Sequence, residues 1–188
     1  MKANVAVAIS GGGRSLENLC LRSNDFGYQI KAVISSSHTC GGLQVAETFN
    51  LPVLIADFVK NQLVADDVAR FLAENEIDWI VLAGFLKPFP ILSQYNKKVI
   101  NIHPSLLPKY GGKGMYGMHV HRRVLSEGDS ESGATIHFVS EKYDEGDIIA
   151  QKKISIEGLK QAEEIASKVF ELECELLPST LHELVTKD

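Results

Sequence analysis

Cysteine is scarce in this chain. Its 188 residues include three cysteines, Cys20, Cys40 and Cys174, and no two of them are close neighbours in the sequence. An odd number of widely separated cysteines fits neither a disulfide framework nor a cysteine-based zinc site. We therefore expect three reduced thiols, as is typical of cytoplasmic proteins.

Long apolar runs and positive charge are also lacking. No stretch approaches the roughly 20 apolar residues that a membrane-spanning helix needs. The 24 acidic side chains outnumber the 19 lysines and arginines, which gives a formal net charge of -5. Because nucleic-acid-binding proteins usually carry a basic excess, we expect neither a nucleic acid nor a membrane as partner. An anionic small molecule stays compatible, since one pocket can be positive on an acidic protein.

Repeats, low-complexity segments and linker-like stretches are absent from the sequence. The apolar start runs directly into a glycine cluster, without the charged region and cleavage site of a signal peptide, and so predicts a first strand. We expect one catalytic domain over residues 1–188. The sequence leaves the oligomeric state open between monomer and homodimer.

Apolar runs alternate with helical patterns over the first half of the chain. Residues 4–9 and 78–83 are nearly continuous apolar runs, which are typical of strands buried on both faces, and residues 28–34, 51–55 and 99–102 predict further strands. Helical spacing of apolar residues occurs between them, at residues 15–21, 42–49 and 63–74. This alternation predicts an α/β fold with a mostly parallel, twisted sheet and flanking helices.

The alternation stops in the second half. Residues 134–139 and 147–154 have the pattern of two strands separated only by a polar turn, which predicts antiparallel strands near the C-terminal part. Helical patterns cover residues 118–125 and 162–185. Pro178 predicts a break or kink in the second of these helices.

A glycine-rich loop, SGGGRS at residues 10–15, joins the first predicted strand to the first helix. The start of a helix favours an anion, and Arg14 and the hydroxyls of Ser10 and Ser15 add donors for phosphate oxygens. A dinucleotide fingerprint does not fit, because its third glycine would fall on Leu16. A tight turn without a ligand is the alternative, but the position of Arg14 favours phosphate binding.

Residues 101–108, NIHPSLLP, are the most informative segment. Asn101 and His103 are two positions apart in a strand and therefore face the same side. An amide donor and an imidazole at the end of a strand suit acyl transfer, because one can hold an oxyanion and the other can move a proton. The alternative is a buried histidine bonded to the backbone and an asparagine that caps a turn.

Six segments together resemble the folate-dependent formyltransferases. In family order they are ISGxG at 9–13, VLAGF at 81–85, NIHPSLLPKY at 101–110, HxHR at 119–122, GxTxHFV at 133–139 and DxGxII at 144–149. They cover nearly the whole chain. The resemblance implies a Rossmann-like formyltransferase fold, and it is closest to members that formylate glycinamide ribonucleotide (GAR) in purine synthesis.

The resemblance implies that Asn101, His103 and Asp144 act together. The amine of the substrate would attack the formyl carbon of 10-formyltetrahydrofolate, and Asn101 would hydrogen-bond the oxygen of the tetrahedral intermediate. His103, as imidazolium, would stabilise the same charge or pass a proton, while Asp144 would orient it and favour its protonated form. Taken alone, Asp144 is an ordinary turn residue.

The binding residues also follow from the resemblance. The residues expected to hold the phosphate of the substrate are Gly13, Arg14 and Ser15. Glu173 is expected to contact the rest of GAR; the alternative is that Glu173 lies on a solvated helix face. Those expected to border the folate, largely through their backbone, are Leu86, Lys87, Pro88, Phe89 and Asn101. Pro88 has no N–H, so a backbone donor must come from one of its neighbours. No metal ion is expected.

Several competing functions remain at this point. A metal-dependent hydrolase is disfavoured, because His119 and His121 would diverge on a helix. Within the superfamily, a formyltetrahydrofolate hydrolase, an amino-sugar N-formyltransferase and a methionyl-tRNA formyltransferase are rivals, and a non-catalytic nucleotide-binding protein is an alternative of another class. The phosphate loop and the single-domain length favour GAR as the acceptor.

The segment at residues 111–118, GGKGMYGM, is longer than we expect for this part of the family. Four glycines among eight residues predict a mobile loop. We hypothesise that this loop closes over the substrate as a lid.

Overall fold

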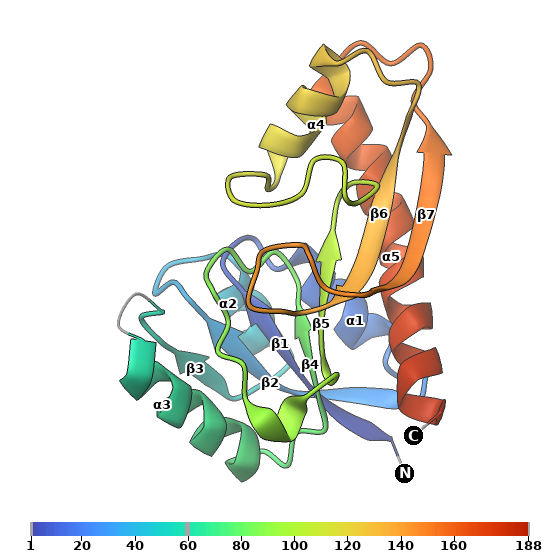
Figure 1. Cartoon of the computed structure of the whole chain (residues 1–188). Coiled ribbons are helices and arrows are strands. Elements are labelled where there is room, and N and C mark those ends of the chain that lie inside the picture. Colours follow the sequence, from blue (N-terminus) through green and yellow to red (C-terminus); the bar gives the residue numbers. More distant parts are fainter. Residues whose placement is uncertain (1, 59–60, 188) are drawn as a thin grey trace.

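The computed structural model describes residues 2–58 and 61–187, and its centre is a seven-stranded sheet in the order β3-β2-β1-β4-β5-β6-β7 (Figure 1). The parallel strands are β1 (Ala3–Ile9), β2 (Tyr28–Ser35), β3 (Val53–Ile55), β4 (Trp79–Leu82) and β5 (Val99–His103). The antiparallel strands are β6 (Glu131–Phe138) and β7 (Ile148–Ser155). The predicted mostly parallel α/β fold, with antiparallel strands near the C-terminal part, is confirmed.

Helices flank the sheet close to their predicted positions. They are α1 (Arg14–Arg22), α2 (Gly42–Thr48), α3 (Asn61–Glu74), α4 (Met118–Ser126) and α5 (Ala162–Lys187), with a short 3-10 turn η1 (Ser93–Tyr95) that the sequence did not predict. α5 continues through Pro178, so the predicted break does not occur. Leu177 and Leu181 are fully buried on either side of this proline, and their packing holds the helix in place. Among the described residues, no helix is both long enough and apolar enough to cross a membrane.

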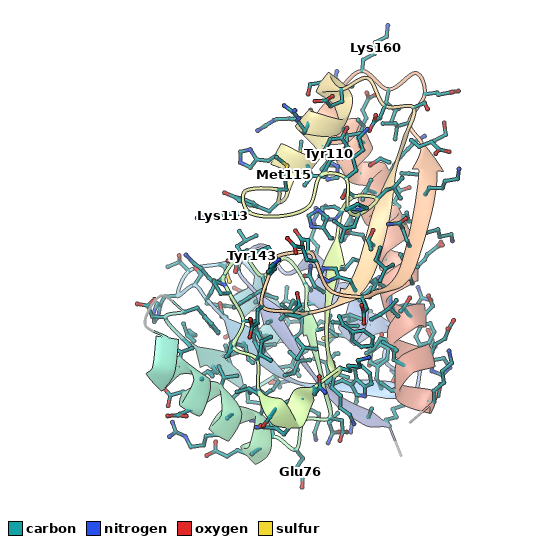
Figure 2. The ribbon with its side chains drawn as sticks, viewed as in Figure 1. Glu76, Tyr110, Lys113, Met115, Tyr143 and Lys160 are labelled. Atoms are coloured by element: carbon teal, nitrogen blue, oxygen red, sulfur yellow. The ribbon has the colours of Figure 1, made fainter. Side chains whose placement is uncertain are left out.

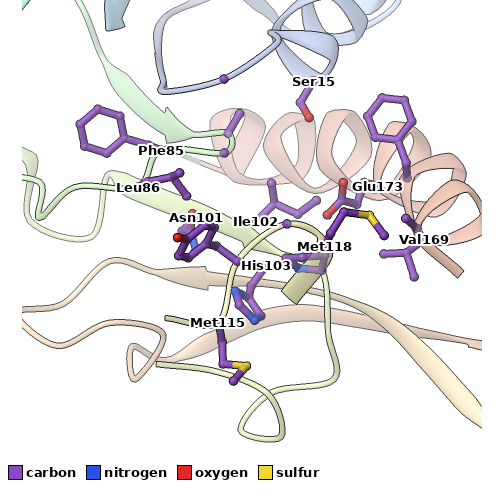
Figure 3. A pocket seen from close by; sticks show the side chains of 18 of the residues that line it. Ser15, Phe85, Leu86, Asn101, Ile102, His103, Met115, Met118, Val169 and Glu173 are labelled. Carbon is purple, nitrogen blue, oxygen red and sulfur yellow. The ribbon is translucent and has the colours of Figure 1, made fainter. Parts of the chain in front are cut away.

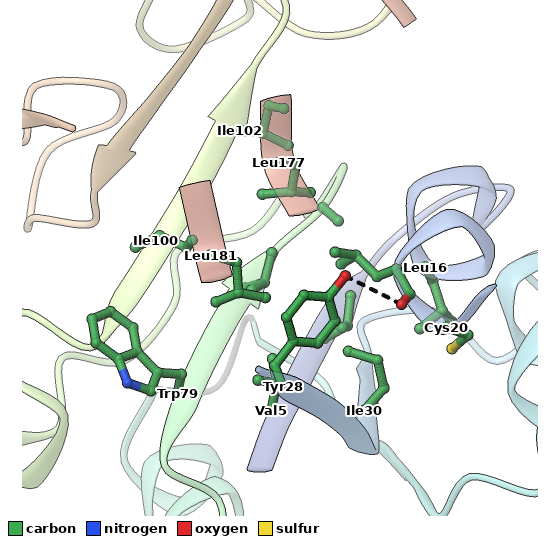
Figure 4. Packing of buried hydrophobic residues seen from close by; sticks show 14 of the residues in the cluster. Val5, Leu16, Cys20, Tyr28, Ile30, Trp79, Ile100, Ile102, Leu177 and Leu181 are labelled. Atoms are coloured by element: carbon green, nitrogen blue, oxygen red, sulfur yellow. Dashed lines mark hydrogen bonds between the residues drawn. The ribbon is translucent and has the colours of Figure 1, made fainter. Parts of the chain in front are cut away.

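The two faces of the sheet are buried against different helices. Along β1, Val5 and Val7 belong to the cluster that packs on α1 and α5, whereas Ala6 and Ala8 belong to the cluster that packs on α3. This alternation follows from the two-residue period of a strand. Figure 4 shows Tyr28 within the first cluster, where its hydroxyl lies 3.4 Å from the carbonyl oxygen of Leu19.

The antiparallel strands extend beyond the end of the parallel ones. His103, the last residue of β5, pairs with Thr135 of β6, so the first residues of β6 continue past β5 together with β7. This extension packs against α4 and the start of α5 through a third apolar cluster, which includes Val120, Ala134 and Ile165. The molecule therefore rises on one side above the ends of β1, β4 and β5 (Figure 1).

Gly133 of β6 lies where no side chain fits. A Cβ atom at this position would come within 2.2 Å of the carbonyl oxygen of Lys152 on β7 and 2.6 Å of Leu106. We predict that Gly133→Ala lowers the free energy of unfolding by about 2 kcal/mol or more, because the backbone of β7 must shift. Urea unfolding would measure the loss.

Gly12→Ala is the matched control, because a Cβ at Gly12 meets nothing within 4 Å. If both variants unfold at the same urea concentration, close packing between β6 and β7 does not require the glycine.

Candidate active site

A cavity of about 630 Å³ lies at the carboxyl ends of β1, β4 and β5. After β1 the chain builds one side of the sheet, and it then returns to build the other side from β4 onward. Open α/β sheets bind their ligands at such a reversal of strand order. Figure 3 shows Asn101 and His103 in the cavity wall, near Met115 and Met118, with Ser15, Val169 and Glu173 on the helices beyond.

The glycine-rich loop forms one end of this cavity. Gly13 has a φ of 80°, and a Cβ on it would come within 2.5 Å of the Cα of Gly42, so the close approach of α1 and α2 requires glycine here. Gly13 precedes α1 without a side-chain cap, and the first N–H groups of a helix have no partner inside it. All three predicted phosphate ligands, Gly13, Arg14 and Ser15, line the cavity.

Arg14 stands at the start of α1 and reaches α5. Its guanidinium carbon lies 4.0 Å from the centre of the Phe170 ring. Glu173, one turn farther along α5, lines the same cavity. Burial raises the pKa of the Glu173 carboxyl to about 7, while the charge of Arg14 acts in the opposite direction. Glu173, which is predicted to contact the substrate, therefore faces the cavity rather than a solvated helix face.

The three predicted catalytic residues lie next to one another. Oδ1 of Asp144 is 3.5 Å from Nδ1 of His103 and 3.4 Å from Nδ2 of Asn101. Oδ2 of Asp144 accepts a 2.8 Å hydrogen bond from the backbone N–H of Gly112. Asp144 has a φ of 57°, in the left-handed region that aspartate tolerates better than most residues. Its carboxylate thus links the 139–147 loop to β5 and to the glycine-rich segment at residues 111–118.

His137 contributes a contact that the sequence analysis missed. Its Nδ1 lies 2.8 Å from the carbonyl oxygen of Phe138 and donates to it, which leaves Nε2 to accept from Nδ2 of Asn101 at 3.0 Å. This pairing fixes which end of the Asn101 amide points toward His137 and Asp144. The signals were its alternation along a predicted strand and its place in the GxTxHFV segment. Its position opposite Asn101 depends on the register between β5 and β6.

The imidazole of His103 is buried between two acceptors. Nε2 donates to the carbonyl oxygen of Tyr110 at 2.7 Å, and Nδ1 faces Asp144. Burial lowers the pKa of His103 below its ordinary value, although the charge of Asp144 and the bond to Tyr110 oppose this effect. Burial therefore disfavours the imidazolium that the resemblance implies, whereas Asp144 favours it. Further negative charge nearby, such as a developing oxyanion, would favour the imidazolium more strongly.

The carboxyl of Asp144 stays ionised in this setting. Burial alone would raise its pKa, but the contact with His137, the charge of His103 and the N–H of Gly112 outweigh burial and hold the pKa below its ordinary value. A fixed negative charge therefore lies beside His103 and Asn101.

A second cavity, of about 90 Å³, lies on the other side of Asn101 and Asp144. These two residues line both cavities. The smaller one is also bordered by the 139–144 loop and by three residues of the predicted folate segment, Lys87, Pro88 and Phe89. Leu86, the other residue of that segment, lines the larger cavity. The structure thus places the expected folate segment beside the predicted catalytic residues Asn101 and Asp144.

Two details of this segment differ from expectation. The N–H of Leu86 donates to the hydroxyl of Ser10 at 2.9 Å, so the backbone donors of the 86–89 segment that remain for a ligand are those of Lys87 and Phe89. The Ser10 hydroxyl also bonds that of Ser36 at 2.6 Å and does not line the larger cavity. The Ser10 hydroxyl is thus engaged by Ser36 and Leu86 in this structure. The side chain of Phe89 is buried with Phe58.

The glycine-rich segment borders the larger cavity through residues 112–118. Figure 2 shows Lys113 and Met115 on this segment, across from Tyr143 of the 139–147 loop. Met115 is partly buried against α4 and α5, while Tyr116 is 45% exposed. Closure of this segment over a substrate stays a prediction.

His121, on α4, is a further residue that sequence analysis did not single out for this cavity. It lines the cavity wall, is 5% exposed, and its Nδ1 has no hydrogen-bond partner among the described residues. Burial lowers its pKa to about 4, and the neighbouring His103 adds to this effect. His119 is exposed instead and packs on Tyr116. Within residues 2–58 and 61–187, no group of three or more histidine, cysteine or acidic side chains is placed to hold a metal ion.

Comparison with known proteins identifies the family. The family model described as formyl transferase matches residues 3–181. The chain belongs to the formyl transferase family. A chloroplastic phosphoribosylglycinamide formyltransferase of Vigna unguiculata is 37% identical to it over 183 residues, which cover 93% of this chain and 58% of that protein. The phosphoribosylglycinamide formyltransferase of Haemophilus influenzae is 36% identical over 181 residues, which cover 93% and 83%.

Solved structures support the same family. The phosphoribosylglycinamide formyltransferase of Coxiella burnetii has a TM-score of 0.88 and 30% identity to this formyl transferase, and the match covers 100% of this chain and 89% of that one. The chain spans about six tenths of the length of two plant relatives, 58% and 63%.

We predict that Asp144→Asn lowers the pKa of His103 further. The substitution removes the negative charge that favours the imidazolium, while burial is unchanged. Titration of the imidazole by NMR, with the His103 signal assigned through His103→Gln, would measure the shift. Asp67→Asn on α3 is the control, since Asp67 pairs with Arg70 on the surface. An unmoved titration in Asp144→Asn would show that this charge does not act on His103.

A second prediction concerns His121 and acid stability. Because the pKa of the folded His121 is about 4, the unfolded chain binds a proton between pH 6.5 and pH 4 that the folded chain does not bind. Stability should therefore fall as the pH falls through this range. His121→Leu should remove up to about 3 kcal/mol of that loss.

Urea unfolding at pH 7.5, 6 and 5 would test the effect of His121 on acid stability, with His119→Leu, at an exposed position, as control. Equal pH slopes in the wild type and in His121→Leu would contradict it.

Proposed function

We propose that this formyl transferase moves the formyl group of 10-formyltetrahydrofolate to the amino group of GAR, in purine synthesis. The observation that carries the proposal is the position of Asn101 and Asp144 in the wall between the two cavities, with His103 beside them. The folate would occupy the smaller cavity and its mouth, and GAR would occupy the larger one. The formyl carbon and the amine would then meet at Asn101.

The larger cavity is suited to a phosphorylated ribose with an amine. Its glycine-rich end offers the first N–H groups of α1 and the guanidinium of Arg14 for a phosphate. Glu173 lies along the wall, where its carboxyl can accept hydrogen bonds from hydroxyl groups of the ribose. His103 and Asn101 border the part where the amine would enter.

The transfer needs no covalent intermediate with the enzyme. The lone pair of the amine forms a C–N bond to the formyl carbon, and the carbonyl electrons move onto oxygen. Asn101 donates to this oxyanion from its amide, and His103 becomes able to hold a proton as the negative charge develops. Collapse of the intermediate breaks the bond to N10 of the folate, and that nitrogen takes up a proton while the former amine loses one. Asp144, ionised beside His103, carries this proton directly or through water.

The remaining expectations belong to the same proposal. Residues 1–188 form one catalytic domain that acts on small molecules in the cytoplasm, as a monomer or homodimer, without a metal ion, nucleic acid or membrane. The single sheet that runs through the described chain supports one domain, and the net charge of -5 supports the absence of a nucleic-acid partner. A formyltetrahydrofolate hydrolase and an amino-sugar N-formyltransferase are the alternatives that share the same catalytic residues.

A spectrophotometric assay separates these functions. It follows deformylation of 10-formyl-5,8-dideazafolate, a stable analogue of the donor, with and without GAR. Loss of the formyl group only when GAR is present supports the proposal. Loss without any amine supports the hydrolase, and loss only with an amino sugar supports that acceptor. Folded protein that binds the folate analogue and GAR without turnover would indicate a non-catalytic protein.

In the same assay, we predict that Asn101→Ala lowers kcat by about 100- to 1000-fold, because the oxyanion loses a donor. Asn96→Ala, on the exposed surface after η1, should keep wild-type kcat. A kcat within a few-fold of the wild type in Asn101→Ala would remove Asn101 from the mechanism.

A further inference from the structure

Phe170 is a cavity residue that the proposed mechanism does not use. It lies on α5, three residues before Glu173, so the two side chains share one face of the helix. Helical patterns assign an aromatic residue at such a position to the core, but Phe170 is only partly buried and lines the cavity. Its ring faces the guanidinium of Arg14 at 4.0 Å.

Arg14 occupies an unusual electrostatic position. It stands at the start of α1, where the helix dipole disfavours a cation. Among the described residues, no carboxylate lies within ion-pair distance of its guanidinium, and no hydrogen bond engages it. Glu173 is near enough for its pKa to feel the charge of Arg14, yet the two do not form an ion pair. The Phe170 ring is the cation–π partner of this guanidinium.

We propose that Phe170 is a positioning residue that keeps Arg14 apart from Glu173 and directs its guanidinium toward the phosphate of the acceptor substrate. The inference rests on the proposed function, because it takes the acceptor to be a ribose phosphate. Stacking on the aromatic face leaves the N–H groups at the edge of the guanidinium free to donate to phosphate oxygens. Without the ring, Arg14 is free to turn to Glu173 and form an ion pair, and both side chains are then lost to the substrate.

The test compares two substitutions of Phe170. Phe170→Leu keeps an apolar side chain but removes the aromatic face, whereas Phe170→Tyr keeps the face. For Phe170→Leu we expect the KM for GAR to rise about tenfold, in line with the strength of a cation–π contact. We expect kcat and the KM for the formyl-folate to stay within about twofold of the wild type, because Asn101, His103 and Asp144 are untouched. Phe170→Tyr should restore the KM for GAR.

Two further comparisons identify the partner of Phe170. With the dephosphorylated acceptor, glycinamide ribonucleoside, Phe170→Leu should have no effect on kcat/KM, since no phosphate is present. In an Arg14→Ala background it should also have no further effect on GAR. Phe71→Leu, the same exchange on α3 away from the cavity, is the control.

A wild-type KM for GAR in Phe170→Leu would overturn the inference. So would an equal loss with both acceptors, or a loss that persists without Arg14. If the wild-type protein transfers no formyl group to GAR, the proposed function fails, and the inference is then tested by calorimetric titration with ribose 5-phosphate. Weaker binding by Phe170→Leu than by Phe170→Tyr would still support it. Equal binding by the two variants, or none by the wild type, would overturn it.

Discussion

The carboxylate of Asp144 is the contact on which the candidate active site depends. It comes from a loop, in a left-handed backbone conformation, and it meets the side chains of Asn101 and His103 and the backbone N–H of Gly112. Through these contacts, a single charge joins β5 to two loops at the edge of the sheet. Because the group is ionised and largely buried, these partners also supply the polar contacts that compensate for its removal from water.

The sheet makes this arrangement available. Its parallel part brings the ends of β1, β4 and β5 to one edge, where the glycine-rich loop and the Asn101 and His103 side chains face a common space. The antiparallel pair then adds height beyond that edge and carries His137 back to Asn101. The first part of α5 packs on β6 and β7, and its later part, through Leu181, packs in the apolar cluster with β1 and α1. One helix therefore supports both the antiparallel and the parallel side of the site.

Local pattern was sufficient for most of the fold, because buried strands and amphipathic helices have distinct periods. It was also sufficient to place Asn101 and His103 on one face of a strand. It could not place Asp144, whose loop has no period, nor the bond between Leu86 and Ser10, which joins residues 76 positions apart. Phe170 resembles a core residue in sequence, and only the packing of α1 against α5 sets its ring beside a cation. Contacts that depend on register and loop shape are thus the ones that sequence reasoning missed.

Asn101 and Asp144 belong to the walls of both cavities, and this has a consequence for the order of events. Two ligands that meet at a shared wall can exchange a group without the enzyme ever carrying it. In the proposed formyl transfer, the donor and the acceptor must therefore be present at the same time, and neither product forms before both substrates have entered. In kinetic terms, such a partition corresponds to a sequential mechanism through a ternary complex, in which double-reciprocal plots intersect, rather than to a ping-pong mechanism with a formylated protein.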